Sequence, residues 1–142
     1  MPFPFDSPEL AAWASGFPIT LLHVGVALAI LVAGASLYAL VTPHREIQLI
    51  REGNAAAALS FGGVLVGIAL PLAFALAAST SVLEILIWGA TTIVVQLALF
   101  WVIDLVLRGL PQRIKQGEVA AAALLVGAKL AVAAILAAAV SG

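Results

Sequence analysis

Four long runs of apolar residues alternate with short polar segments along the chain. The apolar runs cover residues 19–41, 55–78, 84–105 and 119–140. An α-helix needs about 20 apolar residues to cross the roughly 30 Å hydrocarbon core of a bilayer, and each run is that long. The pattern therefore predicts four membrane-spanning helices.

The polar segments after the first and third runs share a pattern. In the first, Gly53 suits the left-handed conformation that ends a helix, and Asn54 is a good N-cap for the next helix. In the second, Gly117 takes the place of Gly53, Glu118 takes the place of Asn54, and alanines follow both. We therefore predict an all-α integral membrane four-helix bundle made of two tandem two-helix hairpin repeats. The repeats cover residues 19–78 and 79–142.

Residues 1–18 form a separate N-terminal segment. Ser7, Pro8 and Glu9 are typical of a helix start, with Ser as N-cap and Pro at the first helical position. Gly16 is expected to end this short helix. Its apolar residues, such as Trp13, favour a position at the headgroup level, and a frayed terminus is the alternative.

Composition supports the membrane interpretation. The chain has 142 residues, of which 64% are hydrophobic and only 9% charged, against about 25% charged in a soluble domain. It has no cysteine, so disulfides and thiolate metal sites are excluded. The net charge of −1 offers no reason to expect a nucleic-acid partner, and we expect the lipid bilayer to be the solvent.

The basic residues predict the orientation. Five of the six lie in the two loops at residues 42–54 and 106–118, and none lies in the outer segments. The positive-inside rule places both loops in the cytoplasm and both termini in the periplasm. Residues 1–17 lack the basic start of a signal peptide. Tyr38, Trp88 and Trp101 lie near span ends, where aromatic rings are expected to anchor at the interface.

Two strings in the first hairpin carry a family resemblance. They are Thr-Pro-His-Arg-Glu at residues 42–46 and Gly-Asn-Ala-Ala-Ala at residues 53–57. With the second-repeat glycine Gly117 and its alanines, the chain resembles the YjfL-like family of small bacterial inner-membrane proteins, known as domain of unknown function 350. The resemblance implies four membrane helices and a possible PspA-like cytoplasmic partner from a membrane-stress context. It implies no activity and no catalytic residues.

Lys129 lies in the middle of the fourth run. A Lys at the centre of a span costs about 3 kcal/mol of insertion free energy. On a helical wheel Ala123, Gly127 and Ala131 share one face, which we expect to pack inside the monomer, and Lys129 lies on the opposite face. Judged by depth, its nearest polar neighbour is Gln96. Three interpretations stay open: an oligomer contact, a transport or ion pathway, and a tolerated Lys.

Other polar and small residues define further candidates. Thr92 and Gln96 share a face of the third helix, and Gly63 and Gly67 in the second form a Gly-x-x-x-Gly step that lets a neighbouring helix approach closely. Asp104 is expected to pair with Arg108, one helical turn away.

His23 and Glu84 lie near the outer surface, but two residues are too few for a metal site. Ser36 and Ser60 have no base beside them in sequence, so we expect neither an enzyme nor a cofactor.

Two functional classes remain. The first is an oligomeric scaffold whose basic cytoplasmic loops recruit soluble partners or anionic lipid, and the second is a small ion channel or transporter. We favour the scaffold because few polar residues lie at mid-membrane depth.

Overall fold

The computed structural model is all-α and describes residues 7–42 and 45–142. The first six residues of the expected N-terminal segment and the Pro43-His44 part of the family string lie outside the described residues. The helices are α1 (Pro8–Val41), α2 (Glu46–Arg51), α3 (Ala55–Ala78), α4 (Val82–Val106), α5 (Leu110–Lys115) and α6 (Val119–Ser141).

Four of these helices, α1, α3, α4 and α6, are long and apolar enough to cross a membrane. The four long apolar helices agree with the prediction of four spanning helices, and the bounds of α3, α4 and α6 are close to those of the apolar runs. Local caps set several of these bounds. The Asn54 side chain accepts a hydrogen bond from the Ala57 N–H at 2.9 Å, and the Ser81 hydroxyl accepts one from the Glu84 N–H at 3.2 Å.

α1 differs from the expectation for the N-terminal segment. Ser7 caps it, as predicted, by accepting a hydrogen bond from the Leu10 N–H. Gly16 does not end the helix, which continues through Pro18 to Val41 as one element of 34 residues, about 51 Å long. A single Gly only lowers helix propensity by about 1 kcal/mol, and the apolar residues on both sides allow the helix to continue.

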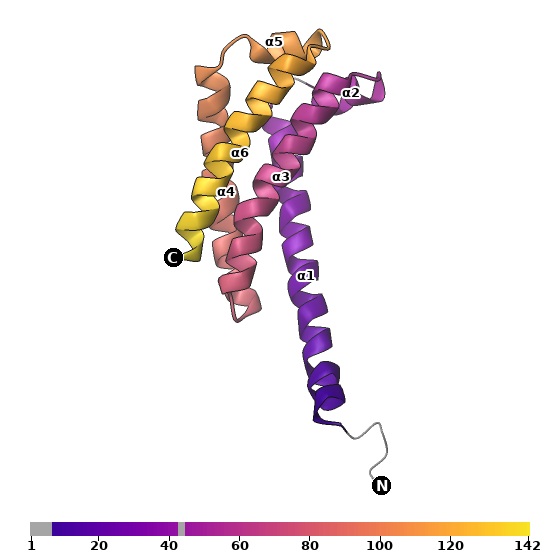
Figure 1. The fold of residues 1–142 in the computed structure, drawn as a ribbon, viewed down its shortest axis with the longest axis vertical. Coiled ribbons are helices and arrows are strands. Elements are labelled where there is room, and N and C mark those ends of the chain that lie inside the picture. Colours follow the sequence, from indigo (N-terminus) through magenta and orange to yellow (C-terminus); the bar gives the residue numbers. More distant parts are fainter. Residues whose placement is uncertain (1–6, 43–44) are drawn as a thin grey trace.

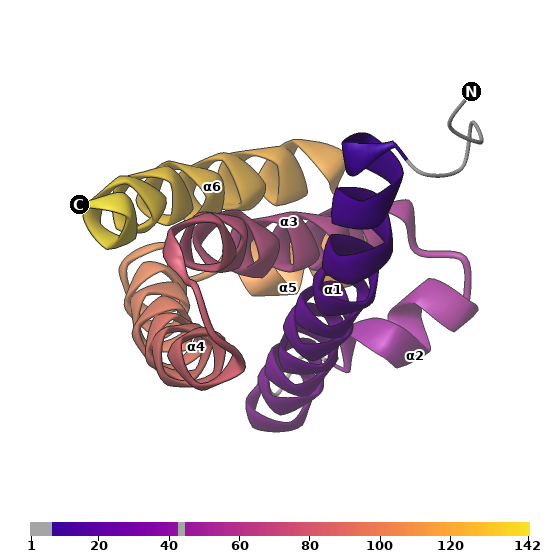
Figure 2. The ribbon, with the colours of Figure 1, turned by 90° about the horizontal axis from the view of Figure 1, so that it is seen from below.

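α3 is the central helix of the bundle. It packs against all five other helices, and its most extensive interface is with α6. In Figure 1 the short helices α2 and α5 lie together at one end, called here the loop end, and α1 begins and α6 ends toward the opposite end. Figure 2 shows α3 between α6 on one side and α1 and α4 on the other. The start of α1 extends beyond the other helices (Figure 1).

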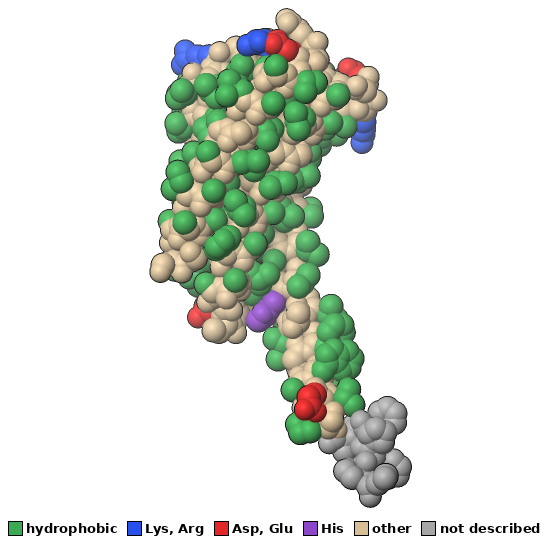
Figure 3. Space-filling model, viewed as in Figure 1, with side chains coloured by type: hydrophobic (Ala, Val, Ile, Leu, Met, Phe, Trp, Pro, Cys, Tyr) green, Lys and Arg blue, Asp and Glu red, His purple; other side chains and the backbone are tan. Residues whose placement is uncertain are grey.

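The two ends of the bundle differ in surface chemistry. Apolar side chains cover its flank, and the Lys and Arg side chains visible in Figure 3 gather at the loop end. Such an apolar flank with polar ends is what a bilayer requires of a spanning bundle.

Both loops end their short helix in the same way. Gly53 and Gly117 have φ values of +88° and +85°, in the left-handed region that glycine tolerates. The residue after each glycine donates its N–H back across the turn, from Asn54 to the Leu49 carbonyl and from Glu118 to the Arg113 carbonyl. This is the Schellman arrangement of a helix C-terminus, so the expected role of both glycines is confirmed.

Gly63 and Gly67 make room for side chains of neighbouring helices. A Cβ added at Gly63 would lie 2.5 Å from Val126 Cγ2 on α6, and one added at Gly67 would lie 2.7 Å from Phe100 Cζ on α4. The two glycines are packed as expected, but each receives a side chain, and the two side chains come from different helices, so they do not form one backbone-to-backbone contact.

We predict that Gly63→Ala destabilises the bundle and that Gly62→Ala does not. Val126 is β-branched and cannot swing away from the new methyl group, so overpacking of about 1–3 kcal/mol is expected. A Cβ at the adjacent Gly62 meets nothing within 4 Å, and that variant serves as the matched control. Thermal unfolding in detergent measures both. Equal melting temperatures for the two variants would contradict the contact.

Candidate functional site

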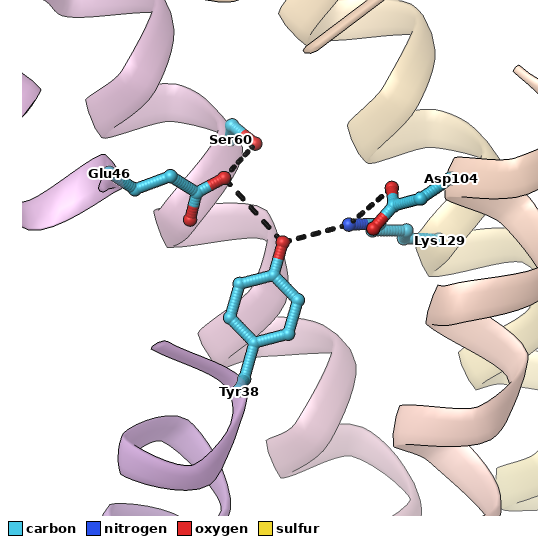
Figure 4. A network of polar contacts seen from close by, with 5 residues as sticks. All are labelled: Tyr38, Glu46, Ser60, Asp104 and Lys129. Carbon is cyan, nitrogen blue, oxygen red and sulfur yellow. Dashed lines mark hydrogen bonds and ion pairs between the residues drawn. The ribbon is translucent and has the colours of Figure 1, made fainter. Parts of the chain in front are cut away.

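A network of five polar side chains lies inside the loop end of the bundle. Tyr38, Glu46, Ser60, Asp104 and Lys129 point toward one another in Figure 4. They come from α1, α2, α3, α4 and α6, respectively. One network therefore joins all four spanning helices and the short helix α2.

Lys129 is the centre of this network. Its side chain is only 1% exposed, and its Nζ lies 3.0 Å from Asp104 Oδ1 in an ion pair. The same ammonium group donates a hydrogen bond to the Tyr38 hydroxyl at 3.0 Å. It also lies 5.2 Å from the centre of the Phe100 ring, within cation–π range. The charge of Lys129 is thus compensated entirely within one protomer.

This position corrects the expectation that Lys129 faces away from the monomer. The buried face of α6 consists of Ala121, Ala122, Leu125, Lys129, Ala133 and Ala137. The face expected to be inside, with Ala123, Gly127 and Ala131, is exposed. Alanines lie on nearly every side of α6, so small residues could not identify the packed side. The buried face of α6 is identified by Lys129, because this charged side chain needs a counter-charge inside the bundle.

Asp104 lies at the depth of the Lys129 ammonium, contrary to expectation, for a geometric reason. Helical side chains lean toward the N-terminus of their own helix. Since α4 and α6 run in opposite directions (Figure 1), Asp104 near the end of α4 leans into the membrane, and Lys129 at the middle of α6 leans toward the loop end. The two side chains therefore meet at a depth that neither Cα position indicates. Gln96 is not among the hydrogen-bond partners of Lys129.

Glu46 extends the network into α2. Its carboxylate accepts a hydrogen bond from the Ser60 hydroxyl at 3.1 Å and a long one of 3.5 Å from the Tyr38 hydroxyl. Glu46 is 8% exposed, and this burial raises the pKa of its carboxyl group above the usual value. Hydrogen bonding by Ser60 and the charge of Lys129 offset only part of that effect.

Asp104 does not pair with Arg108 as expected. Between the residues that the structure describes, the ion pairs are Lys129 with Asp104 and Arg113 with Glu118. The second pair lies in the loop, where hydrogen bonding to Arg113 lowers the pKa of the Glu118 carboxyl group. Glu118 makes no side-chain cap for α6, because its carboxylate is turned toward Arg113.

Asn54 makes a contact that ties the two loops together. Beyond capping α3, its amide nitrogen donates hydrogen bonds to the carbonyls of Ile114 at 3.0 Å and Lys115 at 3.2 Å. These carbonyls belong to the last turn of α5, where backbone acceptors lack partners within the helix. The sequence indicated the cap but not this bridge.

Thr92 and Gln96 are buried on α4, about two turns and one turn before Phe100, respectively. The Thr92 hydroxyl donates to the Gly89 carbonyl at 2.9 Å, a local bond that leaves no polar group free. Gln96 is fully buried, and neither its amide oxygen nor its amide nitrogen has a hydrogen-bond partner among the described residues. A buried amide without partners is unusual in a native structure, because most buried polar groups are hydrogen-bonded.

His23 and Glu84 lie far from the network, toward the opposite end. Glu84 accepts hydrogen bonds from the Thr80 N–H at 2.6 Å and the Thr80 hydroxyl at 3.1 Å, so it stabilises the start of α4. In residues 7–42 and 45–142 no three His, Cys, Asp or Glu residues lie together in a group able to hold a metal ion.

Sequence reasoning missed Tyr38, Glu46 and Ser60 as site residues. Tyr38 is 3% exposed inside the bundle and does not anchor at the interface as expected. Trp88 and Trp101 are both exposed on the flank. A Glu at the first position of a short helix resembles an ordinary helix start, so nothing in the local pattern distinguished Glu46.

Four apolar spanning helices joined toward one end by a buried polar network define a helical integral membrane protein. The chain belongs to the family described as Domain of Unknown Function (DUF350), whose model matches residues 12–140. It is 35% identical over 108 residues to the UPF0719 inner membrane protein YjfL of Escherichia coli strain K12, which covers 76% of this chain and 80% of that protein. The protein of the same description from Escherichia coli O157:H7 matches equally well. No solved structure matches the chain.

We predict that Asp104→Asn destabilises the bundle more than Lys129→Met. Removing one partner of a buried ion pair costs about 3–5 kcal/mol, and Asp104→Asn leaves the fully buried charge without its counter-charge. Lys129→Met leaves Asp104, whose side chain is 19% exposed and reaches solvent. The double variant should be more stable than Asp104→Asn alone. Unfolding in detergent measures the stability of all three variants. Strictly additive losses of stability in the double variant would contradict the ion pair.

Proposed function

We propose that the protein is an oligomeric scaffold of the bacterial inner membrane, not an enzyme, and that its loop end recruits a cytoplasmic partner. The inner-membrane location follows that of the YjfL relatives. The buried network is the observation that carries the proposal. It anchors α2 to the spanning helices through Glu46, and Asn54 anchors α5 in turn. A loop end held in this way presents a fixed surface.

The charge of that surface favours an acidic partner. Arg45, Arg51, Arg108 and Lys115 are exposed there, against one exposed acid, Glu52, that forms no ion pair in the described residues. Glu46 is buried and Glu118 is paired with Arg113. By the positive-inside rule this end faces the cytoplasm and both chain termini face the periplasm. An acidic surface of a soluble protein, such as a PspA-like protein of the membrane-stress context, would be attracted to it.

The two hairpins support a duplicated architecture. Each has a long helix, a six-residue helix, a left-handed glycine and a second long helix. We propose residues 19–78 and 79–142 as tandem repeats related by an axis along the membrane normal, and residues 1–18 as the segment at the outer headgroup level.

The exposed face of α6 supplies an oligomer surface. Lys129 no longer serves that role, since its partners lie within the protomer. Ala123, Gly127 and Ala131 are exposed at four-residue spacing, the small-residue pattern that lets two membrane helices approach closely. We propose that copies of the chain associate along this stripe.

Gly127→Leu should therefore reduce the oligomer without unfolding the protomer. A Cβ at Gly127 meets nothing within 4 Å, so the larger side chain disturbs only a neighbouring copy. Gly25→Leu on α1 is the matched control, because that glycine is equally open. The mass of the complex in native-like nanodiscs reports the oligomeric state of each variant. An unchanged oligomer mass for Gly127→Leu, or an equal loss of oligomer in both variants, would contradict association along this stripe.

The ion channel or transporter is the second candidate, and Gln96 is the observation that favours it. This amide continues the line of buried polar groups from Asp104 toward the middle of α4. Beyond it lies buried Thr92, whose hydroxyl is bonded to the Gly89 carbonyl. Past Thr92, the buried residues of α3 and α4 toward the outer end are apolar, including Leu72, Ala75 and Ile85. The polar line in the described residues therefore stops short of the outer surface, and the scaffold is the better supported function.

Two measurements separate these functions. As a scaffold, the protein reconstituted in liposomes should pass no more ions than empty liposomes. Native complexes should contain a soluble partner whose recovery falls about fivefold in the double variant Arg51→Gln with Lys115→Gln, since two exposed charge contacts are lost. Glu9→Gln at the other end is the control. Ion flux that Lys129→Met abolishes would establish the channel instead.

A further inference from the structure

A cavity of about 350 Å³ lies at the loop end between α1, α4 and α5, outside the network but touching it. Tyr38 and Thr42 line it from α1, and Trp101, Asp104 and Arg108 line it from α4. Its volume is within the range of roughly 300–1,000 Å³ found for small-ligand pockets. Trp101 is 66% exposed on its wall, so the cavity opens on the flank of the bundle.

The depth of the cavity is that of a lipid headgroup. α1 ends at Val41 and α4 ends at Val106, and both ends border the cavity. It therefore lies where two spans leave the hydrocarbon core, with apolar wall residues below and the polar loop above. A water-soluble molecule would have to enter past exposed apolar side chains, whereas a lipid in the bilayer is already at this level.

The charges of the cavity select the kind of headgroup. Asp104 and Arg108 are its acidic and basic lining residues in the described part of the chain, one helical turn apart. They form no ion pair with each other, because Asp104 Oδ1 pairs with Lys129. The carboxylate is 19% exposed, so it reaches the cavity as well as the buried ammonium. The cavity thus offers a ligand a carboxylate as hydrogen-bond acceptor, already paired with Lys129, and beside it the guanidinium of Arg108, which has no ion-pair partner among the described residues.

We infer that this cavity binds the headgroup of a zwitterionic phospholipid with a primary ammonium, of the phosphatidylethanolamine class. The ammonium binds at Asp104 and the phosphate at Arg108, while the acyl chains extend along the outside of α1 and α4. A primary ammonium donates hydrogen bonds to a carboxylate and to Thr42, which a choline headgroup lacks the N–H groups to do. A phosphatidylglycerol headgroup has only neutral hydroxyl donors, which make weaker hydrogen bonds to the Asp104 carboxylate than an ammonium does.

The inference is independent of whether the bundle acts as a scaffold or a channel, and lipid titration tests it. The full-length protein in detergent is titrated with dioleoyl phosphatidylethanolamine, phosphatidylcholine or phosphatidylglycerol, and bound lipid is counted by native mass spectrometry. We expect one phosphatidylethanolamine per protomer, held about tenfold more tightly than the other two lipids, as a charge-assisted hydrogen bond provides.

Arg108→Gln should weaken that binding about tenfold, because Arg108 is exposed and lies outside the buried network. Lys115→Gln, which removes a basic residue of the same loop end away from the cavity, should leave it unchanged. Equal binding of phosphatidylglycerol, or unchanged binding by Arg108→Gln, would overturn the inference. Free phosphoethanolamine that raises the melting temperature as much as the lipid would identify a soluble occupant and overturn it too.

Discussion

The buried charge of Lys129 is the constraint on which the rest of the bundle depends. An uncompensated ammonium at the middle of a span is costly, so some other helix must bring an acid to it. Asp104 does so, and with Tyr38 it closes a contact among α1, α4 and α6. The surrounding packing follows from this requirement. α6 presents its Lys129 face to α3, and Gly63 on α3 receives Val126 so that the two backbones lie close enough.

The network also explains why the short helices α2 and α5 form. A six-residue helix has little stability of its own, because the free energy of helix nucleation is unfavourable and so short a helix forms few hydrogen bonds to offset it. α2 persists because Glu46 reaches into the bundle and bonds to Ser60. α5 persists for a related reason, since Asn54 satisfies its terminal carbonyls from the other loop. The positions of α2 and α5 therefore depend on contacts with the spanning helices and with the other loop.

Helix bounds were predictable from the sequence because their signals are local. Apolar runs, Asn54 as a cap, and Gly53 and Gly117 as helix ends each act within a few residues. The site was not predictable, since Tyr38 and Lys129 are 91 positions apart and meet only through packing. Asp104 and Lys129 were both candidate site residues, but their Cα atoms lie at different depths in the membrane, so the ion pair between them was not predicted. Gly16 misled because a helix-breaking residue is tolerated where the helix is apolar on both sides.

The position of Lys129 on the last helix has a consequence for biogenesis. The ribosome delivers α1, α3 and α4 before α6, so Tyr38, Ser60 and Asp104 enter the membrane while their cationic partner is still unmade. The first three spans can only form an open, partly unsatisfied intermediate. α6 carries the central Lys129, whose charge is costly to insert without a partner. Insertion of α6 is therefore coupled to its packing against the first three spans. Those spans supply the partners of Lys129, and α6 supplies the cation that they lack.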